Sequence, residues 1–312
     1  ANELMANAAE RASVIAELFS GTAYPTDELK QNWIRFLCHA FHDDLTGTSI
    51  QDAYDKFSLP DEKAALLLFT QIRNNANTAV AWKLDTSVDD LNTSVPVVVY
   101  NPVAIARHDV AEVTVQLPGS TPRAVKIYDK NGIEVPSQIK EISGQNIRIL
   151  FMADVPAVGY SVYQVKKSAT PCSISTGLQA SLVRSKTPEA TTEPSVRTSN
   201  GMSTGRLENK RYRVTIDDSG DISSIFDKVA EKELLSGPSR FEIRNDNSAQ
   251  YPAWEVLYED VISSPRCYVD ESVQKTVVDS GPVQVTVRVT RSKEGSNYTH
   301  YYSLTADTEG YL

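Results

Sequence analysis

The first 80 residues carry apolar side chains at the spacing of a helix. Between Leu4 and Phe19 the apolar positions recur every three or four residues, which is the pattern of a helix with one buried face. Gly21 follows directly, and glycine is common just after the last helical residue. The pattern predicts a first helix that ends before Gly21.

Two further helices are predicted in the same region. Pro25-Thr26-Asp27 is typical of a helix start, and a second helix is expected from about Glu28 to Phe41. A third helix is expected to begin near Pro60, because proline is favoured in the first turn and acidic residues follow it. Residues 1–80 are therefore predicted to form a three-helix bundle.

After residue 81 the pattern changes to that of β-strands. Runs rich in β-branched residues, and runs that alternate between apolar and polar positions, follow one another. Asn131-Gly132 between two such runs predicts a hairpin turn. We expect residues 85–167 to form a small antiparallel β-domain. Its strands are predicted at residues 95–100, 110–117, 124–128, 133–135, 146–151 and 160–165.

The last third of the chain predicts a linker and then more β-structure. Residues 168–203 contain Ser, Thr and Pro with few large apolar groups, which favours a linker or long loop. Residues 204–312 are expected to be the start of a larger β-sandwich. Its strands are predicted at residues 212–216, 222–226, 240–243 and 283–289, with a turn at 217–220. The predicted fold class is α+β and multidomain, with a three-helix bundle, a small antiparallel β-domain and part of a larger β-sandwich.

Composition excludes several classes of protein. The chain has 312 residues, a net charge of −9 and no long Lys/Arg-rich run, so a nucleic acid is not expected as a partner. No apolar stretch is long enough for a membrane span. The three cysteines are far apart in sequence, which argues against a disulfide framework or a cysteine-based zinc site.

The strongest candidate for chemistry is the pair His42-Asp43 at the predicted end of the second helix. An imidazole next to a carboxylate can ligate a metal ion and bind a polar substrate at one place. The alternative is a helix cap or a surface pair, which is the commoner role for such residues. Asp44 adds a negative charge beside the negative end of the helix, which is unfavourable unless the carboxylate is solvated or paired, and it is given no chemical role. Thr46-Gly47-Thr48 is interpreted as the turn that places His42.

Four motifs resemble glycoside hydrolase family 38, the α-mannosidases. Phe41-His42-Asp43-Asp44-Leu45-Thr46-Gly47-Thr48 resembles the His-Asp-x-x-x-Gly-Thr segment of the family's middle domain. Asn2-Glu3-Leu4-Met5 resembles the first helix of that domain, and Tyr100-Asn101-Pro102 resembles the strand that follows the bundle. The run from Leu207 to Lys228 resembles the start of the family's large C-terminal β-domain. The motifs occur in the family's order over most of the chain.

This resemblance implies a zinc-dependent, retaining α-mannosidase that acts on terminal α-mannosides of mannose-containing oligosaccharides. His42 matches the family's zinc-ligating His, and Asp43 matches an Asp that contacts a sugar hydroxyl. The remaining zinc ligands and the nucleophilic Asp come from an N-terminal α/β barrel of the same polypeptide, for which this chain has no matching segment. We therefore assign no catalytic residue, and expect the chain to be an inactive fragment of a longer polypeptide that supplies one zinc ligand and bracing domains.

Other candidate residues have weaker support. Trp254 resembles part of an aromatic, acidic loop of the family and is a candidate for stacking on a sugar, with core or interface packing as the alternative. His39 shares a predicted helix face with His42, so a site with both is considered. His108 and His300 are interpreted as structural.

Two other functions remain open at this point. The chain is alternatively a non-catalytic carbohydrate-binding or scaffolding module, made of the bundle and the β-domains. A metal phosphohydrolase of the His-Asp class would need further His and Asp residues on neighbouring helices, and the bundle offers only His39 and His42. The linkage cleaved, the cellular compartment and the oligomeric state do not follow from the sequence.

Overall fold

The structure is a computed structural model that describes residues 1–184, 199–200, 203–252 and 254–306. Its N-terminal part is helical, as predicted. The helices are α1 (Asn2–Ser20), α2 (Thr26–Cys38), α3 (Gln51–Ala53), the π-helical segment η1 (Tyr54–Ser58) and α4 (Leu59–Ala81). Gly21 ends α1 with φ of +73°, and its N–H donates to Glu17 O. The predicted end of the first helix is confirmed.

Of the two predicted boundaries next to the His-Asp segment, the end of the second helix is wrong and the start of the third is confirmed. The second helix ends at Cys38 instead of Phe41, so the segment lies in a turn after the helix. The third predicted helix is α4, which begins at Leu59 and has Pro60 in its first turn; the short α3 and η1 precede it. Pro60 has no backbone N–H and so cannot donate a hydrogen bond within the helix, which matters least in the first turn. The π-helical turn η1 (Tyr54–Ser58) lies directly before α4 and joins it to α3.

The bundle is packed through small residues on α1. Ala6, Ala9 and Ala16 are almost fully buried, which lets α1 lie close against α4. Phe69 of α4 and Leu29 of α2 fill the space between the helices.

The middle of the chain is a small antiparallel β-domain of two sheets, as predicted. One sheet has the order β1-β7-β3-β4 and the other the order β2-β6-β5. Their facing sides share one apolar core. The predicted hairpin at Asn131-Gly132 is confirmed, because β3 pairs with β4 across it and Gly132 has φ of +76°. The strands are β1 (Ser94–Asn101), β2 (Arg107–Val115), β3 (Ala124–Asp129), β4 (Glu134–Val135), β5 (Ser137–Ser143), β6 (Asn146–Val155) and β7 (Gly159–Ser168).

The C-terminal part contains two more sheets around a second core. One has the order β13-β12-β11-β10-β8 and the other the order β18-β17-β16-β9. The strands are β8 (Gln179–Arg184), β9 (Ser199–Asn200), β10 (Ser203–Glu208), β11 (Tyr212–Ile216), β12 (Ile222–Asp227), β13 (Lys232–Glu233), β16 (Glu271–Ser280), β17 (Gln284–Lys293) and β18 (Ser296–Thr305). The turn at 217–220 is confirmed, since Gly220 N–H donates to Asp217 O at 3.0 Å and Gly220 has φ of +82°.

Two predictions in this part need correction. Residues 168–203 were expected to be a linker or loop, but β8 lies in this stretch and pairs with β10 along its whole length. The alternating side chains of β8 are small or polar apart from Leu182 and Val183, so its strand character depends on its partner. Residues 185–198 of the predicted linker lie outside the described residues. The strand predicted at 240–243 is reduced to β14 (Glu242–Ile243), which pairs with β15 (Cys267–Tyr268).

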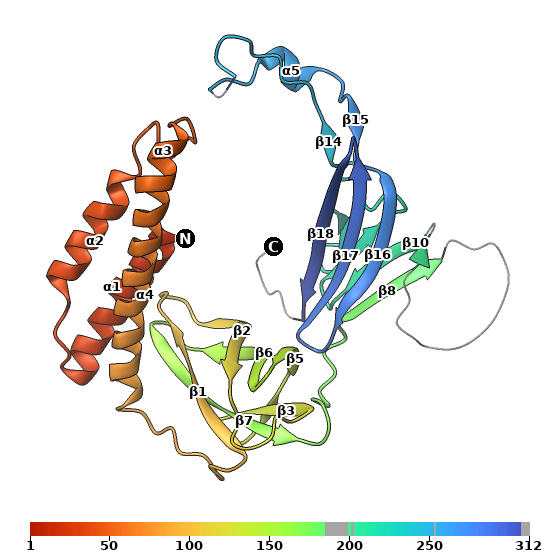
Figure 1. The fold of residues 1–312 in the computed structure, drawn as a ribbon. Helices are drawn as coiled ribbons and strands as arrows, with labels where there is room; N and C mark the ends of the chain where they lie inside the picture. Colours follow the sequence, from red (N-terminus) through yellow and green to blue (C-terminus); the bar gives the residue numbers. More distant parts are fainter. Residues whose placement is uncertain (185–198, 201–202, 253, 307–312) are drawn as a thin grey trace.

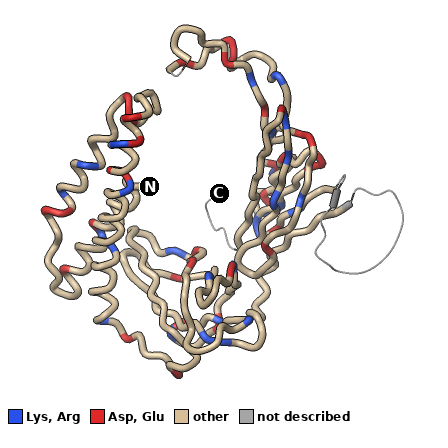
Figure 2. The backbone as a smooth tube through the Cα atoms, viewed as in Figure 1, with Lys and Arg blue, Asp and Glu red and all other residues tan. Residues whose placement is uncertain are grey.

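The parts of the chain form an open arc (Figure 1). The helical bundle and the C-terminal sheets lie on opposite sides of the small β-domain, and the segment with α5 (Tyr258–Ile262) extends from the far end of the C-terminal sheets. Acidic and basic residues are interspersed along the arc (Figure 2), which agrees with the absence of a basic run in the sequence.

Candidate functional site

The turn between α2 and α3 is organised around the backbone carbonyl of Asp43. Thr48 N–H donates to this oxygen at 3.2 Å, Ser49 Oγ at 3.0 Å and the Tyr54 hydroxyl at 3.1 Å. Gly47 has φ of +81°, a conformation that glycine adopts without steric cost. These contacts confirm that the Thr-Gly-Thr segment shapes the turn, and they add Ser49 and Tyr54, which the sequence analysis did not single out.

His39 and Asp44 form a shielded pair beneath this turn. His39 Nδ1 lies 2.6 Å from Asp44 Oδ2, and their side chains are only 11% and 15% exposed. His39 Nε2 lies 3.4 Å from Asp61 Oδ2 on α4, and Arg35 lies near the same carboxylate. Of the two ways to accommodate the charge of Asp44, solvation or pairing, the structure has the pairing. Because a histidine can be cationic, it pairs with the carboxylate that would otherwise lie unfavourably at the end of α2.

The pair changes the pKa of both groups. Burial lowers the pKa of His39, but the hydrogen bonds with Asp44 and Asp61 outweigh it and raise the pKa above its usual value. Burial raises the pKa of Asp44, but the hydrogen bonds with His39 and Ser58 outweigh it and lower the pKa. The charged form of each group is thus favoured by its partner.

His42 and Asp43 differ from that pair because they face solvent. The His42 side chain is 72% exposed and that of Asp43 is 36% exposed, with His42 Nε2 3.3 Å from Asp43 Oδ2. The Phe41 ring lies beside the imidazole at a centroid distance of 4.2 Å. An accessible imidazole and an accessible carboxylate therefore share one fixed turn. His39 points into the pair with Asp44 instead, so the two histidines do not form a joint site.

The donors of this turn fit a zinc ion only as part of a larger set. Imidazole nitrogen and carboxylate oxygen are both ordinary zinc ligands, but a zinc site takes three or four protein ligands. Among the residues that the structure describes, no group of three or more His, Cys, Asp or Glu side chains is placed to hold a metal ion. Any further ligands would have to come from outside this part of the chain.

Trp254 lies in the loop between β14 and α5. Trp254 is 68% exposed, and its backbone N–H donates to the carbonyl oxygen of Tyr251. Within the described residues, no hydrogen bond, ion pair or ring contact joins Trp254 to His42 or Asp43. The loop is rich in exposed apolar side chains. They are Tyr251, Trp254, Val256, Tyr258, Val261 and Ile262.

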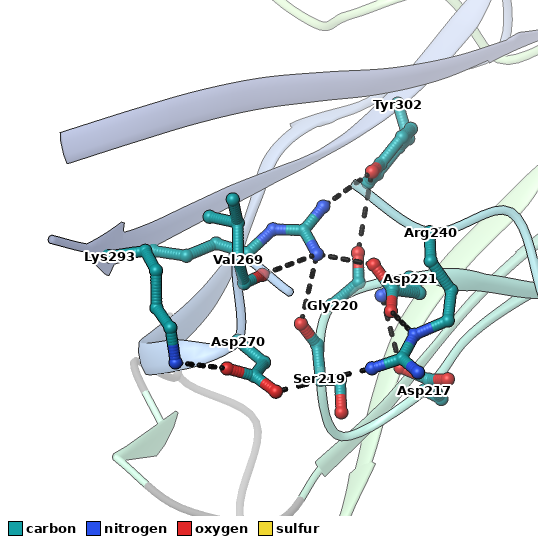
Figure 3. A network of polar contacts seen from close by, with 10 residues as sticks. Asp217, Ser219, Gly220, Asp221, Arg240, Val269, Asp270, Lys293 and Tyr302 are labelled. Carbon is teal, nitrogen blue, oxygen red and sulfur yellow. Dashed lines mark hydrogen bonds and ion pairs between the residues drawn. The ribbon is translucent and has the colours of Figure 1, made fainter. Parts of the chain in front are cut away.

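Arg291, which the sequence analysis missed, is a charged residue that is fully buried in the C-terminal domain. Its side chain is fully buried and donates to Asp221, to the Ser219 and Val269 carbonyls, and to the Tyr302 hydroxyl (Figure 3). Asp221 is also bound by Arg240. Every partner lies on a turn or strand of the C-terminal sheets, so this network holds the domain together.

The other two histidines have different surroundings. His300 lies against the rings of Phe241 and Tyr302, and burial together with Arg291 lowers its pKa. His108 Nδ1 contacts Asp154 across β2 and β6. Both positions agree with a structural role.

Residues 207–310 match the family described as the glycosyl hydrolases family 38 C-terminal domain. The C-terminal third of the chain therefore matches glycosyl hydrolase family 38. The match begins at Leu207 in β10 and covers the buried Asp221–Arg291 network. A search of curated proteins found no match.

Solved structures share the fold of this chain. One is a glycosyl hydrolase family 38 protein from Enterococcus faecalis, with 16% sequence identity and a TM-score of 0.62. Another is an alpha-mannosidase from Enterococcus faecalis V583, with 15% identity and a TM-score of 0.61. Each match covers 93% of this chain, but only 35% and 34% of the two solved chains. The chain therefore spans about a third of their length. No helix among the described residues has the length and apolar character needed to span a membrane.

Proposed function

We propose that this chain is part of a zinc-dependent, retaining α-mannosidase, in which His42 is a zinc ligand and Asp43 binds a sugar hydroxyl. The observation that carries the proposal is the exposed His42-Asp43 pair, held on a hydrogen-bonded turn of a chain whose C-terminal third matches family 38. A neutral imidazole at 72% exposure has a ring nitrogen available to a metal ion.

The role of each side chain follows from its chemistry. His42 would present a ring nitrogen to zinc, while the Asp43 carboxylate would accept charge-assisted hydrogen bonds from the hydroxyls of a mannoside. Zinc, when bound, would act as a Lewis acid toward sugar oxygens. The hydrogen bonds to the Asp43 carbonyl would keep the backbone of both residues in place while a substrate enters and leaves.

The proposal includes an α/β barrel in the same polypeptide, which supplies the other zinc ligands and the nucleophile. Support comes from the solved relatives, of which this chain covers only about a third, and from the pair of donors that is too small for a zinc site. We also propose the domain boundaries 1–80, 85–167 and 204–312, with residues 168–203 as the connection and the two β-domains bracing the barrel. Trp254 would either stack on a mannose ring or pack against the barrel.

The test is hydrolysis of an aryl α-mannoside by the polypeptide that includes the barrel, with bound zinc measured on the same sample. We expect His42→Ala to lose zinc and activity together. His108→Ala serves as the matched control, because His108 is also an exposed histidine paired with an Asp, and it should keep both. Activity and zinc that survive in His42→Ala would remove the ligand role.

A second arm of the test addresses the family activity itself. The chain of residues 1–312 alone should release no mannose, because we assign it no nucleophile. If the longer polypeptide also hydrolyses no α-mannoside, a carbohydrate-binding or scaffolding module becomes the better proposal. The exposed aromatic side chains Tyr251, Trp254 and Tyr258 favour that alternative, and sugar binding that His42→Ala leaves unchanged would support it.

A further inference from the structure

The small β-domain has an open side where its two sheets end. Two adjoining cavities of about 310 and 340 Å³ lie there, and helices α1 and α4 form one wall of the first. They share lining residues from β1, β2 and the segment that follows β1. These shared residues are Val99, Tyr100, Asn101, Pro102, Ala111 and Glu112. We call this region the β1–β2 groove.

The groove is bordered by two strand edges. β1 is the outer strand of the β1-β7-β3-β4 sheet, and β2 is the outer strand of the β2-β6-β5 sheet. An outer strand presents backbone N–H and C=O groups that no neighbouring strand binds. Both edges run beside the bundle (Figure 1).

The hydrogen-bond pattern identifies the open groups of β1. Lys167 N–H donates to Thr93 O at 2.9 Å, and this pair continues the register in which Ser94 lies opposite Lys166. Hydrogen-bonded and non-hydrogen-bonded pairs alternate in an antiparallel ladder. The N–H and C=O groups of Val98 and Tyr100 therefore point away from β7, toward the groove. In the described part of the chain no hydrogen bond is found for these backbone groups.

Pro96 lies on the same open edge of β1. Pro96 has the same orientation as Val98 in this ladder, and its missing N–H costs nothing at an outer position. Toward β2 the pattern is similar. The Val110 N–H points away from β6 and donates to the side-chain carboxylate of its neighbour Asp109. Glu112 is therefore the next residue of β2 whose backbone groups point away from β6.

The groove also exposes side chains of the core between the sheets. Val97, Val99, Ala111 and Val113 line the first cavity and are only partly buried. Phe151, at the floor of the same cavity, is fully buried. An added strand would cover the four partly buried side chains with its own apolar face.

Arg73 of α4 lines the first cavity and donates to the amide oxygen of its neighbour Asn74. Among the described residues, no carboxylate forms an ion pair with it. Glu112, the acidic residue beside it, is paired with Arg148. An acidic group on an occupant would therefore be bound by Arg73.

We propose that the β1–β2 groove binds an extended peptide segment of a partner protein, which adds to β1 as an extra antiparallel or parallel strand. Its backbone bonds to Val98 and Tyr100, its alternate apolar side chains cover Val97 and Val99, and an acidic residue pairs with Arg73. Strand addition of this kind takes affinity from main-chain hydrogen bonds and specificity from alternate side chains. The proposal does not depend on the α-mannosidase activity.

The test uses the acetylated peptide Thr-Val-Thr-Val-Thr-Val-Glu with a fluorescent label, titrated with the chain of residues 1–312 and followed by anisotropy. Val98→Pro removes one outward N–H while Pro96 already shows that this edge accepts proline. We expect Val98→Pro to weaken binding about tenfold or more. Val98→Thr is the matched control, since it keeps the N–H and a similar volume, and it should bind as the unchanged chain does.

Hydrogen exchange on the unchanged chain provides a second measurement, which stands if Val98→Pro fails to fold. Bound peptide should slow exchange of the Val98 and Tyr100 amides and leave that of Val97, already bonded to β7, unchanged. Equal binding to Val98→Pro, slowed exchange elsewhere only, or no binding at millimolar peptide would each overturn the proposal. An Arg73→Gln variant should lose affinity for this peptide but not for one that ends in Gln.

Discussion

His39 Nδ1 and Asp44 Oδ2 lie 2.6 Å apart beneath the turn that carries His42 and Asp43. His39 directly follows the last residue of α2, and Asp44 lies within the turn. The pair therefore ties the turn to the bundle, while the two exposed residues next to it remain free of the core. Side chains that contact no substrate can still fix those that do.

The pair predicts a pH-dependent stability. The pKa of His39 is raised in the fold, so its contribution is complete below the unfolded pKa and is lost as pH rises through the folded pKa. The pKa of Asp44 is lowered, so its contribution is complete above the unfolded pKa and is lost as pH falls through the folded one. Arg35 and Asp61 are the other charged groups near His39.

We therefore expect His39→Gln to cost more unfolding free energy near about pH 5.5 than near about pH 8.5. Denaturant unfolding at both values measures this. His108→Gln is the control, because His108 lies in a more exposed pair. A cost for His39→Gln that is the same at both pH values would contradict the ion-pair interpretation.

Gly47→Ala should destabilise the turn through backbone strain alone. Its φ of +81° disfavours a side chain, although an added Cβ would meet no atom within 4 Å. The expected loss is about 1–2 kcal/mol. Gly237→Ala, at another open position without positive φ, should cost much less. If both substitutions cost the same, conformational strain at Gly47 is not the cause.

Arg291→Met should be the most destabilising single change in the C-terminal domain. It leaves the buried Asp221 carboxylate with Arg240 as its remaining charged partner, and loss of one member of a buried pair costs about 3–5 kcal/mol. Thermal or denaturant unfolding measures the loss. Arg107→Met removes a half-exposed pair with Asp109 and should have a small effect; similar losses for both would argue against the network.

Gln138 joins the small β-domain to the C-terminal sheets. Its Oε1 accepts from the N–H groups of Val283 and Gln284 at 2.9 Å each, and its Nε2 donates to Gln284 O. Gln138→Ala should leave those N–H groups without their partner and separate one calorimetric unfolding transition into two. Gln116→Ala, on an exposed position, should leave the transition unchanged. A single sharp transition in Gln138→Ala would show that the domains are coupled by other contacts.

Trp254→Ala should leave the stability of this chain nearly unchanged, because the side chain is 68% exposed. In the longer polypeptide it should lower either the affinity for a mannoside or the stability, depending on whether the ring contacts sugar or barrel. Trp33→Ala, which removes a partly buried ring packed on Phe69, should destabilise the chain in both contexts. An effect of Trp254→Ala on the short chain would place the ring in a contact within it.

The sequence determined the local elements because their signals are local. Helical spacing before Gly21, the Asn131-Gly132 hairpin and the turn at Gly220 depend on a few neighbouring residues, and each is found as predicted. The His42-Asp43 segment could be proposed as a site from the sequence for the same reason. Its motif is continuous along the chain.

Only the tertiary structure decided which side chains are shielded and which strands find partners. β8 is polar enough to be taken for a linker, but pairing with β10 satisfies its backbone. Asp44 and Arg291 look like surface charges in sequence. In the structure, Asp44 pairs with His39 at the end of α2, and Arg291 pairs with Asp221, which lies in a turn 70 residues earlier in the chain. Burial and pairing are relations between distant segments, so they are fixed only when the chain has folded.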